Sequence, residues 1–144
     1  MVAANIMDTE GPRLTGESTF GEAVALLVTE GVARIPVVDS GGRVLGVLKE
    51  AALLDAALRG GVPASKGVLM DAASMERVKV SGLVQRDFKG VAPETPVAAI
   101  VEAFLDKDDP VSAVFVLDDK ERLLGVITPV EVLKSQWKWM EKKR

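Results

Sequence analysis

The chain has 144 residues, a formal net charge of −3 and 48% hydrophobic residues, which suffices for one compact domain or two small halves with a real core. It contains no cysteine and no histidine, which excludes disulfides, thiolate chemistry, imidazole acid–base catalysis and nearly every zinc site. No run approaches the roughly 18 apolar residues of a membrane span, and no signal-like core follows the start, so we expect a cytoplasmic protein.

The first half predicts an extended segment at 13–15 and then a helix from a cap at Ser18 or Thr19 to about Glu30. Apolar residues recur there at helical spacing, and Gly31 stands where a C-cap belongs. A buried strand at 35–38, an acidic turn at 39–42, a second strand at 43–48 and a helix at 50–58 follow, and Gly60-Gly61 closes that helix.

The second half repeats this order. We expect an extended segment at 90–92, a helix from about 95 to 106, and strands at 112–117 and 123–127 around a turn at 118–120. The last helix begins near Pro129, whose missing N–H would have no partner in a first turn, and continues through Met140. Between the halves, Met70, Ala73 and Arg77 share one face of a predicted short helix.

The two halves are copies of one unit. Asp39 and Asp118 are 79 residues apart, and so are Gly46 and Gly125, which interrupt the second apolar run of each copy. Nearer the start of each copy the spacing is 77, and at this spacing residues 5–7 (NIM) align with residues 82–84 (GLV). We therefore predict two copies packed as a pseudo-symmetric body, at 1–61 and 80–136, with a connecting segment at 62–79 and a basic tail at 137–144.

The order of helix, strand, acidic turn, strand and helix carries two recurring motifs, 35–39 (IPVVD) and 125–131 (GVITPVE). It resembles the cystathionine β-synthase (CBS) domain, and two such units resemble a CBS pair, or Bateman module, over about 4–135. The resemblance implies an α/β (α+β) fold of two pseudo-symmetric CBS units, each a small β-sheet flanked by helices. It also implies a non-catalytic regulatory module that binds an adenosine-containing ligand in the cleft between the two units.

In this family the Asp that ends the G-h-h-T-x-x-D motif holds the ribose hydroxyls, and the Thr lies near the ribose or phosphate. These roles carry over to Glu131 and Thr128, with Pro129 between them. Copy one has Lys49 and Ala52 at the equivalent positions, so its ribose clamp is missing. We expect one nucleotide site built on the motif of copy two, and a degenerate or altered site in copy one.

Further ligand contacts follow from the same resemblance. Arg34 precedes a buried strand where the family often places a residue that faces phosphate, and Lys49 could offer a second charge. The extended segments should line the adenine pockets, through Leu14, Thr15, Val91 and Ala92. Structural roles stay open for all of these residues: solvated cations, core packing for the apolar side chains, a helix cap for Thr128, and a dipole interaction for Glu131.

The last helix ends in Trp137, Trp139 and a basic tail, which could pack across a dimer interface, dock a partner or meet an anionic membrane. Two residues apart, the tryptophans lie on different helix faces, which argues against the membrane. We expect AMP, ADP or ATP as the ligand, with S-adenosylmethionine as an alternative, a homodimer, a separate regulated protein, and no cofactor, metal, membrane or nucleic acid. The alternative function is a dimerisation or interaction module with degenerate ligand sites.

Overall fold

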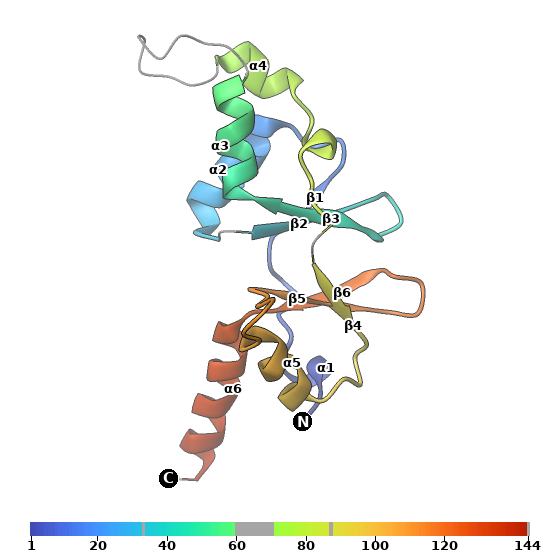
Figure 1. The fold of residues 1–144 in the computed structure, drawn as a ribbon, viewed down its shortest axis with the longest axis vertical. Helices are drawn as coiled ribbons and strands as arrows, with labels where there is room; N and C mark the ends of the chain where they lie inside the picture. The colour runs from blue at the N-terminus through green and yellow to red at the C-terminus, as the bar shows by residue number, and fades with distance from the viewer. Residues whose placement is uncertain (33, 60–70, 87, 144) are drawn as a thin grey trace. The chain divides into compact units, whose positions relative to one another are not determined.

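The computed structural model describes residues 1–32, 34–59, 71–86 and 88–143. They divide into two compact units, Pro12–Asp87 and Met1–Gly11 with Phe88–Arg144, here called the 12–87 unit and the 88–144 unit. Each unit contains a three-stranded sheet with helices packed on it, as Figure 1 shows. Among the described residues, no helix combines the length and the apolar character needed to cross a membrane.

The 12–87 unit contains β1 (Leu14–Thr15), α2 (Phe20–Glu30), β2 (Arg34–Val38), β3 (Val44–Lys49), α3 (Glu50–Arg59), α4 (Ala72–Arg77) and the 3-10 turn η2 (Val80–Gly82). Its sheet has the order β1-β2-β3, with β1 parallel and β3 antiparallel to β2. Thr19 caps α2 by accepting the Glu22 N–H at 3.1 Å, and Gly31 ends it at φ 64°, as predicted. Helix α4 contains Ala73 and Arg77 of the predicted short helix, whereas Met70 and Gly60-Gly61 lie outside the described residues.

The 88–144 unit contains α1 (Ala3–Ile6), β4 (Lys89–Val91), α5 (Val97–Phe104), β5 (Val114–Leu117), β6 (Leu123–Ile127) and α6 (Pro129–Lys142). Its sheet, β4-β5-β6, repeats the strand directions of the other unit. Helix α5 ends two residues before the predicted end. Asp106 Oδ1 accepts the N–H groups of Asp108 and Asp109, at 2.8 and 3.0 Å, and so forms a turn instead of a further helical residue.

Each unit has its own core of β-branched and aliphatic side chains. In the 12–87 unit the buried set is Leu14, Phe20, Ala23, Ile35, Val37, Leu48, Leu53, Ala57 and Val80. In the 88–144 unit it is Ala3, Ile100, Val114, Val116 and Ile127. Complete burial of a Val or Ile side chain contributes about 1.5–3 kcal/mol, so the two sheets are held mainly by these faces.

The leading segment of each sequence copy belongs to the unit built from the body of the other copy. The Ala3 N–H donates to Thr95 O at 2.8 Å, and the equivalent Val80 N–H donates to Ser18 O at 2.9 Å. Further along, the segment adds one bridge beside the third strand of each sheet, between Asp8 and Val126 in one unit and between Gln85 and Val47 in the other. All four bridge hydrogen bonds measure 2.8–2.9 Å. The exchange of leading segments is thus the same in both halves.

Candidate functional site

The predicted ribose clamp lies at the start of α6. Thr128 is extended, at φ −115° and ψ 173°, and Pro129 takes the first helical position. Glu131 Oε1 accepts hydrogen bonds from both the Thr128 N–H, at 2.7 Å, and the Thr128 hydroxyl, at 2.6 Å. Its second oxygen, Oε2, makes no hydrogen bond or ion pair with any described residue. Glu131 therefore caps the helix with one oxygen, while the other makes no hydrogen bond with a described residue.

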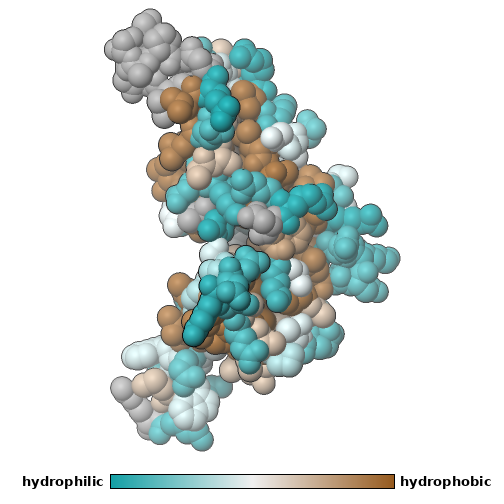
Figure 2. All heavy atoms as spheres, viewed as in Figure 1, coloured by the Kyte–Doolittle hydropathy of each residue, from teal (hydrophilic) through white to brown (hydrophobic). Residues whose placement is uncertain are grey.

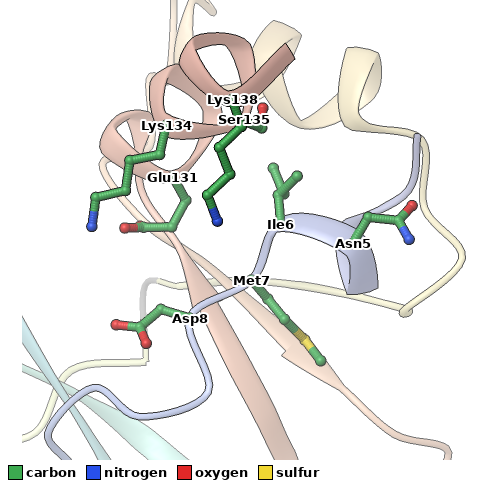
Figure 3. A pocket seen from close by; sticks show the side chains of 8 residues that line it. All are labelled: Asn5, Ile6, Met7, Asp8, Glu131, Lys134, Ser135 and Lys138. Carbon is green, nitrogen blue, oxygen red and sulfur yellow. The ribbon is translucent and has the colours of Figure 1, made fainter. Parts of the chain in front are cut away.

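A hollow of about 290 Å³ lies between α6 and the leading segment in the 88–144 unit. Its lining residues are Asn5, Ile6, Met7, Asp8, Glu131, Lys134, Ser135 and Lys138. In Figure 3 the side chains of Glu131, Lys134 and Lys138 all extend from α6 towards the Asp8 end of the segment. The Asn5 amide points away at the other end, and Met7 points to the sheet. Charged groups thus gather at one end of this hollow.

Two polar groups of the hollow are held by local hydrogen bonds. Asp8 Oδ1 accepts the Glu10 N–H at 3.0 Å, and the Asp8 backbone is fixed by its bridge to Val126. The Ser135 hydroxyl donates to Val132 O at 2.6 Å. The Asp8 carboxylate is therefore positioned beside the segment, whereas the proton of Ser135 is already used.

An equivalent hollow of about 450 Å³ lies in the 12–87 unit. Its lining residues are Ala51, Ala52, Asp55, Gly82, Leu83, Val84 and Gln85. The repeat spacing of 77 places 82–85 at the positions of 5–8, and the spacing of 79 places Ala52 at Glu131 and Asp55 at Lys134. The two units therefore form a hollow at the same place with different side chains.

The remaining predicted contacts fall into separate pairs. Arg34 begins β2 and stands opposite Lys49, the last residue of β3, so two cations are neighbours at this end of the sheet. Leu14 is only 7% exposed and belongs to the core, whereas Thr15 beside it is exposed. In the 88–144 unit Val91 is half-buried and Ala92 is exposed just after β4. Of the predicted residues, the structure brings Thr128, Pro129 and Glu131 into one cluster and Arg34 and Lys49 into another.

Sequence reasoning missed five polar residues of the hollow in the 88–144 unit: Asn5, Asp8, Lys134, Ser135 and Lys138. A signal for the two lysines was present, because 131, 134, 135 and 138 have the spacing of a single helix face. Asn5 and Asp8 had no such signal, since their place depends on which unit the leading segment joins.

Comparisons with known proteins agree with this architecture. The CBS domain family model matches residues 2–59 and again 80–138. No curated protein matches the chain by sequence. A CBS domain-containing protein of unknown function from Bacillus anthracis str. Ames Ancestor is similar in structure, with 20% identity and a TM-score of 0.75; the match covers 96% of this chain and 94% of that one.

Two further solved structures contain bound nucleotides. CbpB in complex with c-di-AMP has a TM-score of 0.75 and 15% identity, over 99% of this chain and 88% of that one. CBSX2 in complex with AMP has a TM-score of 0.74 and 19% identity, over 99% and 98%. At these identities the likeness concerns the fold. With two family matches in register and a repeated sheet-and-helix unit, this chain belongs to the CBS domain family, as a tandem CBS pair.

Proposed function

We propose that this CBS pair is a non-catalytic regulatory module that binds an adenosine-containing ligand and acts on a separate protein. The observation that carries the proposal is the geometry of Glu131, which lines the hollow and whose Oε1 is fixed by Thr128 while Oε2 makes no hydrogen bond with a described residue. A positioned carboxylate oxygen accepts hydrogen bonds from a ribose diol. The AMP complex of the similar CBSX2 supports the choice of ligand class.

Arg34 and Lys49 are proposed to contact phosphate. Both side chains can donate hydrogen bonds to phosphate oxygens, and the two residues are cross-strand partners at one end of the β2–β3 ladder. Adenine contacts are assigned to the two extended segments. In each segment a buried or half-buried residue, Leu14 or Val91, is followed by an exposed one, Thr15 or Ala92.

Thermal unfolding with added ligand tests the proposal. A ligand present at about 100 times its dissociation constant stabilises the folded state by about 2.7 kcal/mol. For a chain of this size that corresponds to a rise of several degrees in Tm. The panel is AMP, ADP, ATP and S-adenosylmethionine, and a Tm unchanged by every one of them would exclude the adenosine ligand.

Glu131→Gln separates ligand binding from helix capping. Glutamine at this position still completes a capping box, so the Tm without ligand should stay near the wild-type value. Replacing the charged acceptor by a neutral one should weaken ligand binding about tenfold, because hydrogen bonds to charged groups are roughly twice as strong. Glu141→Gln, an exposed residue of the same helix, is the matched control and should bind like wild type.

We also propose that the module is a homodimer. Helix α6 exposes an apolar stripe at helical spacing, made of Val130, Leu133, Trp137 and Met140, which are 40–67% exposed. Helix α3 exposes Leu54 and Leu58, which the 79-residue spacing equates with Leu133 and Trp137. Figure 2 shows apolar side chains at the surface over α2 and α3, and hydrophilic ones over the turns of the hairpins. Apolar faces of this kind are favourable for a second copy.

A dimerisation module with degenerate ligand sites is the second candidate function. It is favoured by copy one, where Lys49 and Ala52 replace the motif that copy two keeps as Thr128 and Glu131. The two functions differ in one readout. A dimer with no response to any adenosine compound would support the second, whereas a response lost in Glu131→Gln supports the first.

A further inference from the structure

Two lysines of the hollow in the 88–144 unit are like charges on one helix face. Lys134 and Lys138 are four residues apart, and both side chains are exposed. Neither makes an ion pair with any described residue. Like charges at this spacing destabilise a helix slightly, and an anion bound between them would remove the repulsion.

The equivalent helix in the 12–87 unit has the opposite arrangement. There the repeat places Asp55 and Arg59 at the positions of Lys134 and Lys138. Arg59 Nε donates to both oxygens of Asp55 at 3.0 Å, so these charges neutralise each other. The same backbone position therefore carries a closed ion pair in one unit and, in the other, two ammonium groups that make no ion pair with a described residue.

Acceptors stand beside these two donors. Glu131 Oε2 makes no hydrogen bond with a described residue, and Asp8 presents its carboxylate at the same end of the hollow. Carboxylates accept from sugar hydroxyls, whereas lysine ammonium groups donate to phosphate oxygens. A ligand that satisfies both must carry hydroxyls and a phosphate on neighbouring atoms, as a ribose phosphate does.

We propose that this hollow binds the ribose–phosphate part of a phosphorylated nucleoside and that Lys134 and Lys138 select for the phosphate. Its volume of about 290 Å³ lies just below the roughly 300–1,000 Å³ usual for ligand pockets, which suits part of a nucleotide. The adenosine part of this assignment rests on the proposed function. The phosphate part depends only on the lysines, and it disfavours adenosine and S-adenosylmethionine as ligands of this hollow.

Calorimetric titration of the full chain tests the assignment, with adenosine, AMP, ADP and pyrophosphate as probes. The test variant is K134Q/K138Q. The control is K142Q/K143Q, which removes two charges from the end of the same helix, outside the hollow. We expect the wild type and the control to bind AMP and ADP at least tenfold more tightly than adenosine. In K134Q/K138Q that preference should fall about fivefold or more while adenosine affinity is kept, and any preference that remains is assigned to Arg34 and Lys49.

A gain-of-binding variant gives an independent measurement. D55K removes the acid of the closed ion pair and places two cations on the equivalent face of α3. We expect it to bind one more pyrophosphate per chain than the wild type. An unchanged pyrophosphate stoichiometry in D55K would count against the two-cation arrangement as sufficient for phosphate binding.

The outcomes separate this inference from the proposed function. Equal affinity for adenosine and AMP, or a K134Q/K138Q variant that keeps the preference, overturns the lysine assignment and leaves the adenosine ligand standing. Pyrophosphate binding that depends on the lysines, with no response to adenosine compounds, supports the phosphate pocket and overturns the adenosine ligand. No binding of any probe overturns both.

Discussion

Gly125 of β6 lies directly against Met7 of the leading segment. A Cβ atom added to Gly125 would stand 2.7 Å from Cγ and 2.8 Å from Sδ of Met7. At the equivalent position, a Cβ added to Gly46 would overlap the backbone carbonyl oxygen of Gln85. The glycine repeated in both copies is therefore required by the close approach of the exchanged segment.

Alanine at the two glycines should destabilise the protein unequally. Gly46→Ala meets a backbone carbonyl that is fixed by the bridge to Val47, so we expect a loss of about 2–3 kcal/mol in the free energy of unfolding. Gly125→Ala meets a flexible methionine side chain, and a loss of about 1 kcal/mol is expected. Urea unfolding measures both variants, and a Gly46→Ala protein as stable as Gly125→Ala would contradict the backbone contact.

Glu121 carries strain that glycine would relieve. It has φ 63° in the hairpin turn of the 88–144 unit, where the other unit has Gly42 at φ 86°. A residue with a Cβ atom costs about 1 kcal/mol in this region. Glu121→Gly should therefore raise the free energy of unfolding by about 0.5–1 kcal/mol, whereas the reciprocal Gly42→Ala should lower it by a similar amount. A destabilised Glu121→Gly protein would exclude strain as the dominant effect at this turn.

Asp118 makes stability dependent on acid pH. The backbone N–H of Arg122, at 2.9 Å, and its guanidinium, at 2.7 Å, hold the pKa of Asp118 below its usual value. A lowered folded-state pKa gives stability that is present above the unfolded pKa of about 3.9 and is lost as pH falls through the folded pKa.

Asp118→Asn should therefore lose less stability than the wild type between about pH 5 and pH 3, measured by urea unfolding. The contrast should shrink at high salt, because Arg122 is half exposed. Asp119→Asn is the matched control, since Asp119 is exposed and makes no hydrogen bond with a described residue. An Asp118→Asn protein with the full acid sensitivity of the wild type would show that other groups dominate in this pH range.

The two tryptophans of α6 should differ in their effect on dimerisation. Both are 55% exposed, but only Trp137 lies in the apolar stripe with Leu133; Trp139 lies off it, with Lys143 Nζ at 5.8 Å from its ring. Trp137→Lys should weaken the dimer tenfold or more, since loss of a central interface tryptophan often costs about 2 kcal/mol or more. Trp139→Lys should leave it unchanged. Sedimentation equilibrium compares them, and equal dissociation constants would remove the stripe as the interface.

Much of the fold could be predicted from local signals. Helix α2 was predicted with its cap and its end, because Thr19 and Gly31 are residues whose side chain or backbone freedom fixes a helix terminus. The register of the two copies also followed from Asp39 and Asp118, which open the same turn in each. The division into CBS units at 1–61 and 80–136 describes the sequence copies and stays a prediction. The compact units of the structure are 12–87 and 88–144, the second of which also includes 1–11.

The candidate site was predictable only in part. Thr128 and Glu131 were predicted as parts of one short motif, each with its own role, and their three-residue spacing is also that of the capping box that joins them. Asp8 reaches the hollow through a bridge to Val126, more than a hundred residues away, and no local pattern specifies such a pairing. The repeat establishes which segments are equivalent. It is equally consistent with a leading segment that packs on its own copy and with one that packs on the other copy.

The exchanged leading segments also restrict how the chain can be divided. A fragment that ends after α3 would keep the sheet β1-β2-β3 but lose the segment around Gln85, which pairs with Val47 of that sheet. The same fragment would still carry the segment around Asp8, whose partner Val126 lies in the missing part of the chain. This fragment and the rest of the chain would each supply the leading segment that the other lacks, and so form a swapped complex. Two molecules of a single sequence copy would exchange leading segments in the same way. The tandem chain thus has the topology of a domain-swapped dimer whose two subunits have been joined by a covalent linker.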